Sequence, residues 1–143
     1  MRPDSGRIPP TKQAAGRLRR VAKPVTTSDL RRHLDRYGTT ASVITVSDDH
    51  RPHVVTSGVD LDDDRVLVRV GPRSAEHLRS HPDLCLIWAP PDGEDYLLIV
   101  DASAVEVAPD GEEFTVVASP TSGIRHRVAD AASTGPTCIT LDA

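Results

Sequence analysis

Short β-rich segments separated by turn residues follow one another from residue 41 to residue 141, and this succession restricts the chain to a β-rich fold. Between residues 65 and 70, Val66, Val68 and Val70 alternate with two arginines and a leucine. Side chains two positions apart lie on the same face of a strand, so this alternation predicts a strand with one buried face.

The same criteria predict seven strands and two short helices. We expect strands at residues 41–47, 52–59, 65–70, 84–89, 96–107, 114–118 and 137–141, and helices at 29–37 and 75–80. Residues 84–89 are all apolar, which predicts a strand buried on both faces. Many short strands and few helices favour an antiparallel barrel or sandwich over alternating strands and helices, and closure into a barrel removes exposed edges. The fold class is therefore mainly β, with six to seven antiparallel strands.

Charge divides the 143 residues into two parts. Residues 1–32 carry nine Lys or Arg against two Asp, whereas the remaining residues carry eight basic against nineteen acidic side chains. Residues 1–26 are also rich in Pro and Gly and poor in apolar side chains, so we expect a disordered basic tail. We assign residues 27–143 to one barrel domain. Only the tail suggests contact with nucleic acid.

Several classes of function have no support in the sequence. Cys85 and Cys138 are far apart and belong to no Cys-x-x-Cys pair, so we expect two free, buried thiols. His77 and His81 have the i, i+4 spacing of metal ligands, but no third ligand is identifiable, and we predict no metal site. No apolar run is long enough for a signal peptide or a membrane helix, which predicts a cytoplasmic protein with no membrane contact.

Residues 69–82, RVGPRSAEHLRSHP, contain the strongest candidate for a binding site. A strand ends at a Gly-Pro turn, an arginine follows, and Ser74 is placed to cap the helix expected at residues 75–80. Unpaired amides at a helix start attract anions, and Arg73 and Arg69 offer planar donors for a phosphate. The same residues also fit an ordinary capped helix with surface arginines.

The order of these motifs resembles a known family. A helix, a strand beginning RPHVV at residues 51–55, the strand leading to GPRS at 71–74, the run 84–88 and the segment YLLIVDASAVEV at 96–107 together resemble the pyridoxamine 5'-phosphate oxidase-like FMN-binding split β-barrels. The segment SPTSGIRHR at residues 119–127 is similar to the tail of short actinobacterial members. The resemblance covers residues 28–142.

This resemblance implies a homodimer with flavin sites at its interface and an FMN-dependent oxidoreductase acting on a small molecule. Six residues would bind the cofactor: Val55 and Thr56 along the ring, Arg69, Arg73 and Ser74 at the phosphate, and Trp88 at the border. Many members carry a lysine in the short helix, where this chain has Glu76. A deazaflavin such as F420, a haem-like ligand, or a non-catalytic dimeric barrel with no cofactor are therefore the alternatives.

Overall fold

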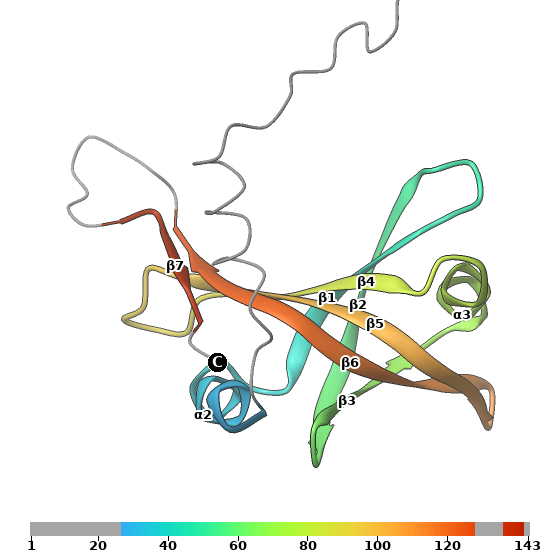
Figure 1. Cartoon of the computed structure of the whole chain (residues 1–143), viewed down its shortest axis with the longest axis horizontal. Coiled ribbons are helices and arrows are strands. Elements are labelled where there is room, and N and C mark those ends of the chain that lie inside the picture. Colours follow the sequence, from blue (N-terminus) through green and yellow to red (C-terminus); the bar gives the residue numbers. More distant parts are fainter. Residues whose placement is uncertain (1–26, 128–135, 142–143) are drawn as a thin grey trace, which may run out of the picture.

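The computed structural model describes residues 27–127 and 136–141 (Figure 1). The expected disordered tail, residues 1–26, lies outside the described residues. In the part of the chain that is described, neither helix is long and apolar enough to cross a membrane.

The described residues form two helices and seven strands. The helices are α2 (Thr27–Tyr37) and α3 (Pro72–Ser80). The strands are β1 (Thr40–Val46), β2 (Pro52–Asp62), β3 (Arg65–Val70), β4 (Asp83–Trp88), β5 (Leu97–Asp110), β6 (Glu113–His126) and β7 (Cys138–Thr140). These elements confirm the predicted mainly β class and the number of strands.

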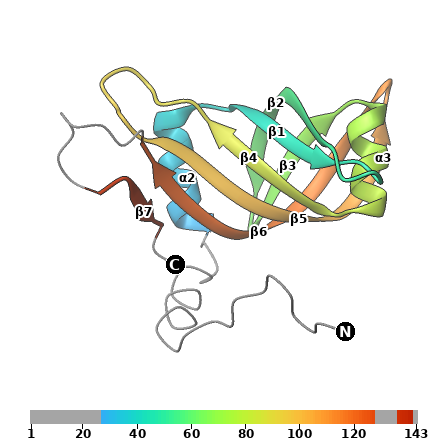
Figure 2. The same ribbon diagram turned by 90° about the horizontal axis from the view of Figure 1, so that it is seen from above.

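The first six strands close into an antiparallel barrel. The order of all seven strands in the sheet is β3-β2-β1-β4-β5-β6-β7. An additional pairing of β3 with β6 closes the first six strands into a ring. Strand β7 pairs only with β6 and lies outside the closed ring. Helices α2 and α3 lie at opposite ends of the barrel in both views (Figures 1 and 2). The predicted antiparallel barrel with two short helices is confirmed.

Strands β2 and β6 extend well beyond their predicted ends, because a partner strand continues beside each of them. Strand β6 extends to His126 instead of ending at 118, and its second half pairs with β5 from Leu97 onward. Strand β2 extends through the predicted turn to Asp62, since its last residues pair with β3. Local turn composition gives no information on such distant partners.

The inward faces of the strands form one apolar core. Val66, Val68 and Val70 are all buried, as their alternation predicts. In β4 only alternate residues are buried, and Cys85 and Ile87 remain partly exposed. The predicted burial of residues 84–89 on both faces is therefore wrong for the single chain, because no other part of the described chain covers the outer face of this strand.

Helix α3 begins earlier than its predicted start at residue 75. Gly71 is the N-cap in an extended conformation and Pro72 occupies the first turn, where a missing N–H costs nothing. Ser74 thus lies within the first turn instead of capping the helix, and it is buried. This register orients the first turn of α3 toward the opening between β2 and β3.

Candidate functional site

The barrel is split along one edge of β2. Strand β2 pairs with β1 from Pro52 to Gly58, but its pairing with β3 begins only at Val59. Beyond that point β3 ends and the chain turns at Gly71 into α3. The first half of β2 therefore has a strand on one side only.

Backbone groups on the open side of β2 are available to a ligand. Hydrogen-bonded and non-bonded pairs alternate along an antiparallel ladder. The amide of Val59 donates to Thr39 and that of Ser47 donates to Arg51, which fixes the odd-numbered residues of β2 as those bonded to β1. Val54 and Thr56 consequently direct their N–H and C=O groups to the opening, where the described residues supply no ladder partner.

A cavity of about 530 Å³ occupies this opening. It extends along β2 from His53 to Gly58 and across to the end of β3 and the start of α3. Five of the six residues predicted to bind a cofactor line it: Val55, Thr56, Arg69, Arg73 and Ser74. The fold thus brings two segments some fifteen residues apart in sequence to one cavity, hereafter the split-edge groove.

The end of the split-edge groove at α3 has the properties of an anion site. Ser74 is only 2% exposed and lines the groove, yet its hydroxyl has no hydrogen-bond partner among the described residues. The amides of Arg73 and Ser74 lie in the first turn of α3, where helix amides have no intrahelical acceptor. Arg73 is exposed beside them and forms no ion pair within the described chain. These donors fit a phosphate or carboxylate.

Arg69 is in a different electrostatic position. Its guanidinium lies 3.4 Å from a carboxylate oxygen of Asp110 and 3.8 Å from one of Glu113, and its side chain is 56% exposed. Glu113 itself lines the groove. Ion pairs this exposed are weak, so an anionic ligand can compete for Arg69 at small cost.

Trp88 does not line the groove. Its side chain is 0% exposed in the core, and its indole N–H has no hydrogen-bond partner. It lies at the end of β4, opposite Leu98 of β5. The structure therefore gives Trp88 a packing position and no contact with the groove.

Several residues that line the groove are absent from the predicted set, and one that the sequence could have indicated is His53. It faces the same side of β2 as Val55 and Ser57, and that alternation was the available signal. The His77 ring lies edge-on to His53, with ring centroids 5.3 Å apart. No group of three or more His, Cys, Asp or Glu side chains in the described residues is placed to hold a metal ion.

Comparison with known proteins identifies relatives and a fold. No family model matches the sequence. An uncharacterized protein of Mycobacterium bovis, Mb0449c, is 35% identical over 109 residues, which cover 68% of this chain and 75% of that protein. The protein MT0457 of Mycobacterium tuberculosis gives the same values. This chain belongs to their family.

Solved structures with the same fold have diverse ligands in their descriptions. A Clostridium acetobutylicum protein described as related to general stress protein 26, of the pyridoxinephosphate oxidase family, has a TM-score of 0.57 at 14% identity, covering 78% of this chain and 91% of that one. An F420 reductase has a TM-score of 0.53 at 14% identity, covering 72% and 91%. An FAD-binding protein from Mesorhizobium loti has 0.54 at 12%, covering 68% and 90%. The fold is the pyridoxamine 5'-phosphate oxidase-like split barrel.

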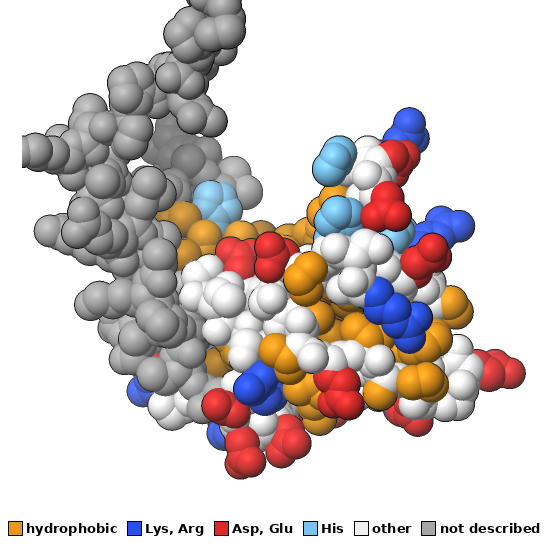
Figure 3. Space-filling view, turned by 45° about the vertical axis from the view of Figure 1, so that its right-hand side comes forward, with side chains coloured by type: hydrophobic (Ala, Val, Ile, Leu, Met, Phe, Trp, Pro, Cys, Tyr) orange, Lys and Arg blue, Asp and Glu red, His pale blue; other side chains and the backbone are white. Residues whose placement is uncertain are grey.

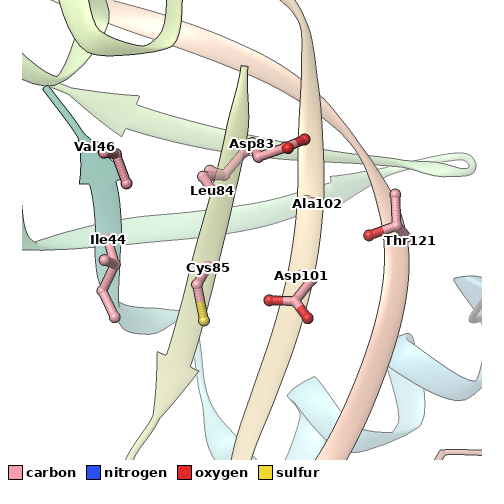
Figure 4. Close-up of a pocket in the computed structure, with 8 residues that line it drawn as sticks. All are labelled: Ile44, Val46, Asp83, Leu84, Cys85, Asp101, Ala102 and Thr121. Carbon is pink, nitrogen blue, oxygen red and sulfur yellow. The ribbon is translucent and has the colours of Figure 1, made fainter. Parts of the chain in front are cut away.

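A second cavity, of about 370 Å³, lies on the outer face of this split barrel (Figure 4). Ile44 of β1, Cys85 of β4 and Asp101 of β5 contribute to its lining, and Cys85 pairs with Asp101 across the ladder. Burial, followed by the negative charge of Asp101 and a hydrogen bond to it, raises the pKa of the Cys85 thiol from 9.0 to about 11. Both cysteines are free, but Cys85 is partly exposed and Cys138 is exposed, so the prediction that both are buried is wrong.

We expect Cys85 to react slowly with iodoacetamide. In a Cys138→Ser variant at pH 8, the rate should be on the order of 100-fold below that of free cysteine, because a pKa about two units higher leaves that much less thiolate. The raised pKa favours the protonated thiol in the folded protein, so its contribution to stability is present below pH 9 and is lost as the pH rises toward 11. Mass spectrometry of timed samples measures the rate. Labelling as fast as free cysteine would contradict this environment, and a Cys85→Ser variant measures the reactivity of Cys138 alone.

Proposed function

We propose that this protein binds a flavin-type cofactor in the split-edge groove and is an oxidoreductase that transfers hydride to a small molecule, with FMN as the first candidate cofactor. The observation that carries this proposal is the single cavity that joins an open strand edge to an unpartnered anion site. When bound, a flavin supplies the hydride chemistry, and the protein supplies position, electrostatics and exclusion of water.

The strand edge of the groove suits the polar rim of a flat heterocycle. Val54 and Thr56 offer alternating N–H and C=O groups there, and Val55 adds an apolar side chain that packs against the core. The Ser57 hydroxyl donates to the carbonyl of Arg69 and so links β2 to β3 across the split. This contact fixes the width of the groove at one end.

The α3 end of the groove suits the phosphate of the cofactor. The phosphate would be held by Ser74, by the first-turn amides of α3 and by Arg73. Arg69 would add a further contact once its exposed ion pairs with Asp110 and Glu113 are broken. Hydrogen bonds to a charged group stabilise a complex more than neutral ones.

The carboxylates near the groove favour a second candidate function. Glu113 lines the groove, and Glu76 lies exposed on α3 two residues after Ser74. Negative charge there weakens the attraction for a phosphate, which suits a non-catalytic barrel that binds a less charged ligand. The related structures described as an F420 reductase and an FAD-binding protein support a deazaflavin or a dinucleotide as alternatives to FMN.

Apolar side chains on the outer face of the barrel support the proposal of a homodimer. Partly exposed apolar side chains of three neighbouring strands gather there: Ile44 of β1, Ile87 of β4 and Ile99 of β5. Burial of such a patch against a second copy removes apolar surface from water. Analytical ultracentrifugation tests this part of the proposal, and a monomer at micromolar concentration would contradict it.

The cofactor is tested by titrating the purified protein with FMN and with F420 and following absorbance and fluorescence. We expect FMN to remain bound after desalting, and an Arg73→Ala variant to bind it about 10- to 100-fold more weakly, the cost of hydrogen bonds to a charged group. Arg79→Ala is the matched control, because Arg79 also lies on α3 but packs over Phe114 instead of lining the groove.

Each outcome of this titration distinguishes the candidates. Retention of F420 instead of FMN would select the deazaflavin alternative. Uptake of neither would contradict the oxidoreductase proposal and favour the non-catalytic barrel. If the Arg73→Ala and Arg79→Ala variants bound FMN equally weakly, the result would contradict a phosphate site at the start of α3.

A further inference from the structure

The split-edge groove continues beyond Arg73 into a basic compartment. A cavity of about 330 Å³ lies there, and its lining contains Arg51, His53, Arg73 and His77 but no carboxylate. His53 and Arg73 line both cavities, so the two are contiguous. The combined groove follows β2 from Gly58 to Pro52, a length of about 20 Å at the usual rise per residue. Basic side chains therefore line the groove both at the start of α3 and at the start of β2.

The two arginines of this basic compartment are available to a ligand. Arg73 forms no ion pair with another described residue. Arg51 lies 3.2 Å from a carboxylate oxygen of Asp49 through its Nε, but both side chains are largely exposed. A pair of that kind contributes little to stability and leaves the terminal nitrogens of Arg51 free to bind an anion.

The imidazole of His77 is held in position by a buried partner. Its Nδ1 lies 3.0 Å from the hydroxyl of Thr45, and Thr45 is fully buried in the barrel. The ring of His53 packs edge-on against it. A side chain held in this way loses little conformational entropy when it binds a ligand, so His77 is prepared to act as a hydrogen-bond donor through its second nitrogen.

Negative charge limits the basic compartment on one side. Asp48, Asp49 and Glu76 border an adjoining cavity together with Arg73 and His77. Figure 3 shows histidine, basic and acidic side chains gathered at this end of the molecule. Repulsion by Asp48 and Glu76 disfavours an anion in that adjoining cavity, whereas Asp49 is the exposed partner of Arg51 that a bound anion would replace.

We propose that the basic compartment binds a second anionic group of the same ligand, so that the cofactor of this groove carries two anionic groups in line. The first lies at the start of α3, and the second, a phosphate or a carboxylate, lies between Arg51 and His77. This inference rests on the proposed function for the first anion, and it favours a dinucleotide or a cofactor with an anionic tail over FMN.

Comparison of three cofactors tests the inference. Dissociation constants for FMN, FAD and F420 are measured with the wild type and with an Arg51→Gln/His77→Gln double variant. We expect FAD or F420 to bind about tenfold more tightly than FMN to the wild type, and the double variant to lose that advantage while its affinity for FMN is unchanged. A preference for FAD identifies a second phosphate, and a preference for F420 identifies its acidic tail. Arg65→Gln, on β3 and outside both cavities, is the control.

A probe without a flavin separates failure of this inference from failure of the proposed function. Pyrophosphate added to the apoprotein should shift the imidazole NMR signals of His53 and His77, and the double variant should lose the shift at His53. Tight FMN binding with no preference for a second anion and no response to pyrophosphate would overturn the basic compartment alone. A response to pyrophosphate without any flavin or F420 binding would support it and overturn the proposed cofactor. Absence of all binding would overturn both.

Discussion

Replacement of Trp88 by alanine is expected to lower the free energy of unfolding by about 3–5 kcal/mol, the usual cost of removing a large aromatic side chain from a core. Trp88 is the largest fully buried side chain of the described residues, and it joins β4 to β5 in the core opposite Leu98. Urea titration followed by circular dichroism measures the effect, since the variant contains no tryptophan for fluorescence.

Two further variants serve as controls for Trp88→Ala. Trp88→Phe keeps most of the apolar volume and removes an indole N–H that has no partner, so its loss should be clearly smaller. Val105→Ala, at a side chain 56% exposed, should change stability little. If Trp88→Phe were as stable as the wild type but failed to bind flavin, the indole would belong to the site, as the family resemblance implies.

Replacement of Glu94 by glutamine is expected to lower the free energy of unfolding by about 2–3 kcal/mol, below the cost of breaking a fully buried ion pair, because water still reaches Arg125. Glu94 is only 10% exposed and accepts hydrogen bonds from two guanidinium groups, at 2.8 Å from Arg125 and 2.5 Å from Arg36. The Tyr37 hydroxyl hydrogen bond, together with the charge of Glu94, raises the pKa of Arg125. These contacts join α2 to β6 and to the loop before β5.

Loss of the Glu94 carboxylate leaves Arg125, 18% exposed, without its negative partner. Thermal and urea unfolding measure the change, and Glu112→Gln serves as the control because Glu112 is exposed at the turn between β5 and β6. We expect the control to change stability by less than about 0.5 kcal/mol. An equal effect in the two variants would mean that water already screens the Glu94 network.

Neither Trp88 nor Glu94 lines the split-edge groove, so their variants help to interpret the binding experiments. A variant at Arg73 or Arg51 that unfolds like the wild type but binds less cofactor has lost a ligand contact. Both arginines are exposed, so little loss of stability is expected.

The sequence predicts those features of the structure that depend only on neighbouring residues. The alternation of Val66, Val68 and Val70 predicts a buried strand face, because the period of a strand is a property of the backbone alone. The Gly-Pro turn before Arg73 likewise predicts a strand end and a helix start, since both residues restrict the backbone locally. These local patterns and the family resemblance together predicted six site residues, and five of them line one cavity.

Only the tertiary structure decided which strand edges are paired and which side chains meet across the chain. The end of β6, the open side of β2 and the buried position of Trp88 all depend on partners distant in sequence. The contact between His53 and His77 has the same origin, because it forms only when residues of β2 and α3, distant in sequence, are brought together. Local composition determined the strands and the turns, whereas closure of the barrel selected the gap in which the groove lies, because pairing between distant segments depends on the packing of the whole chain.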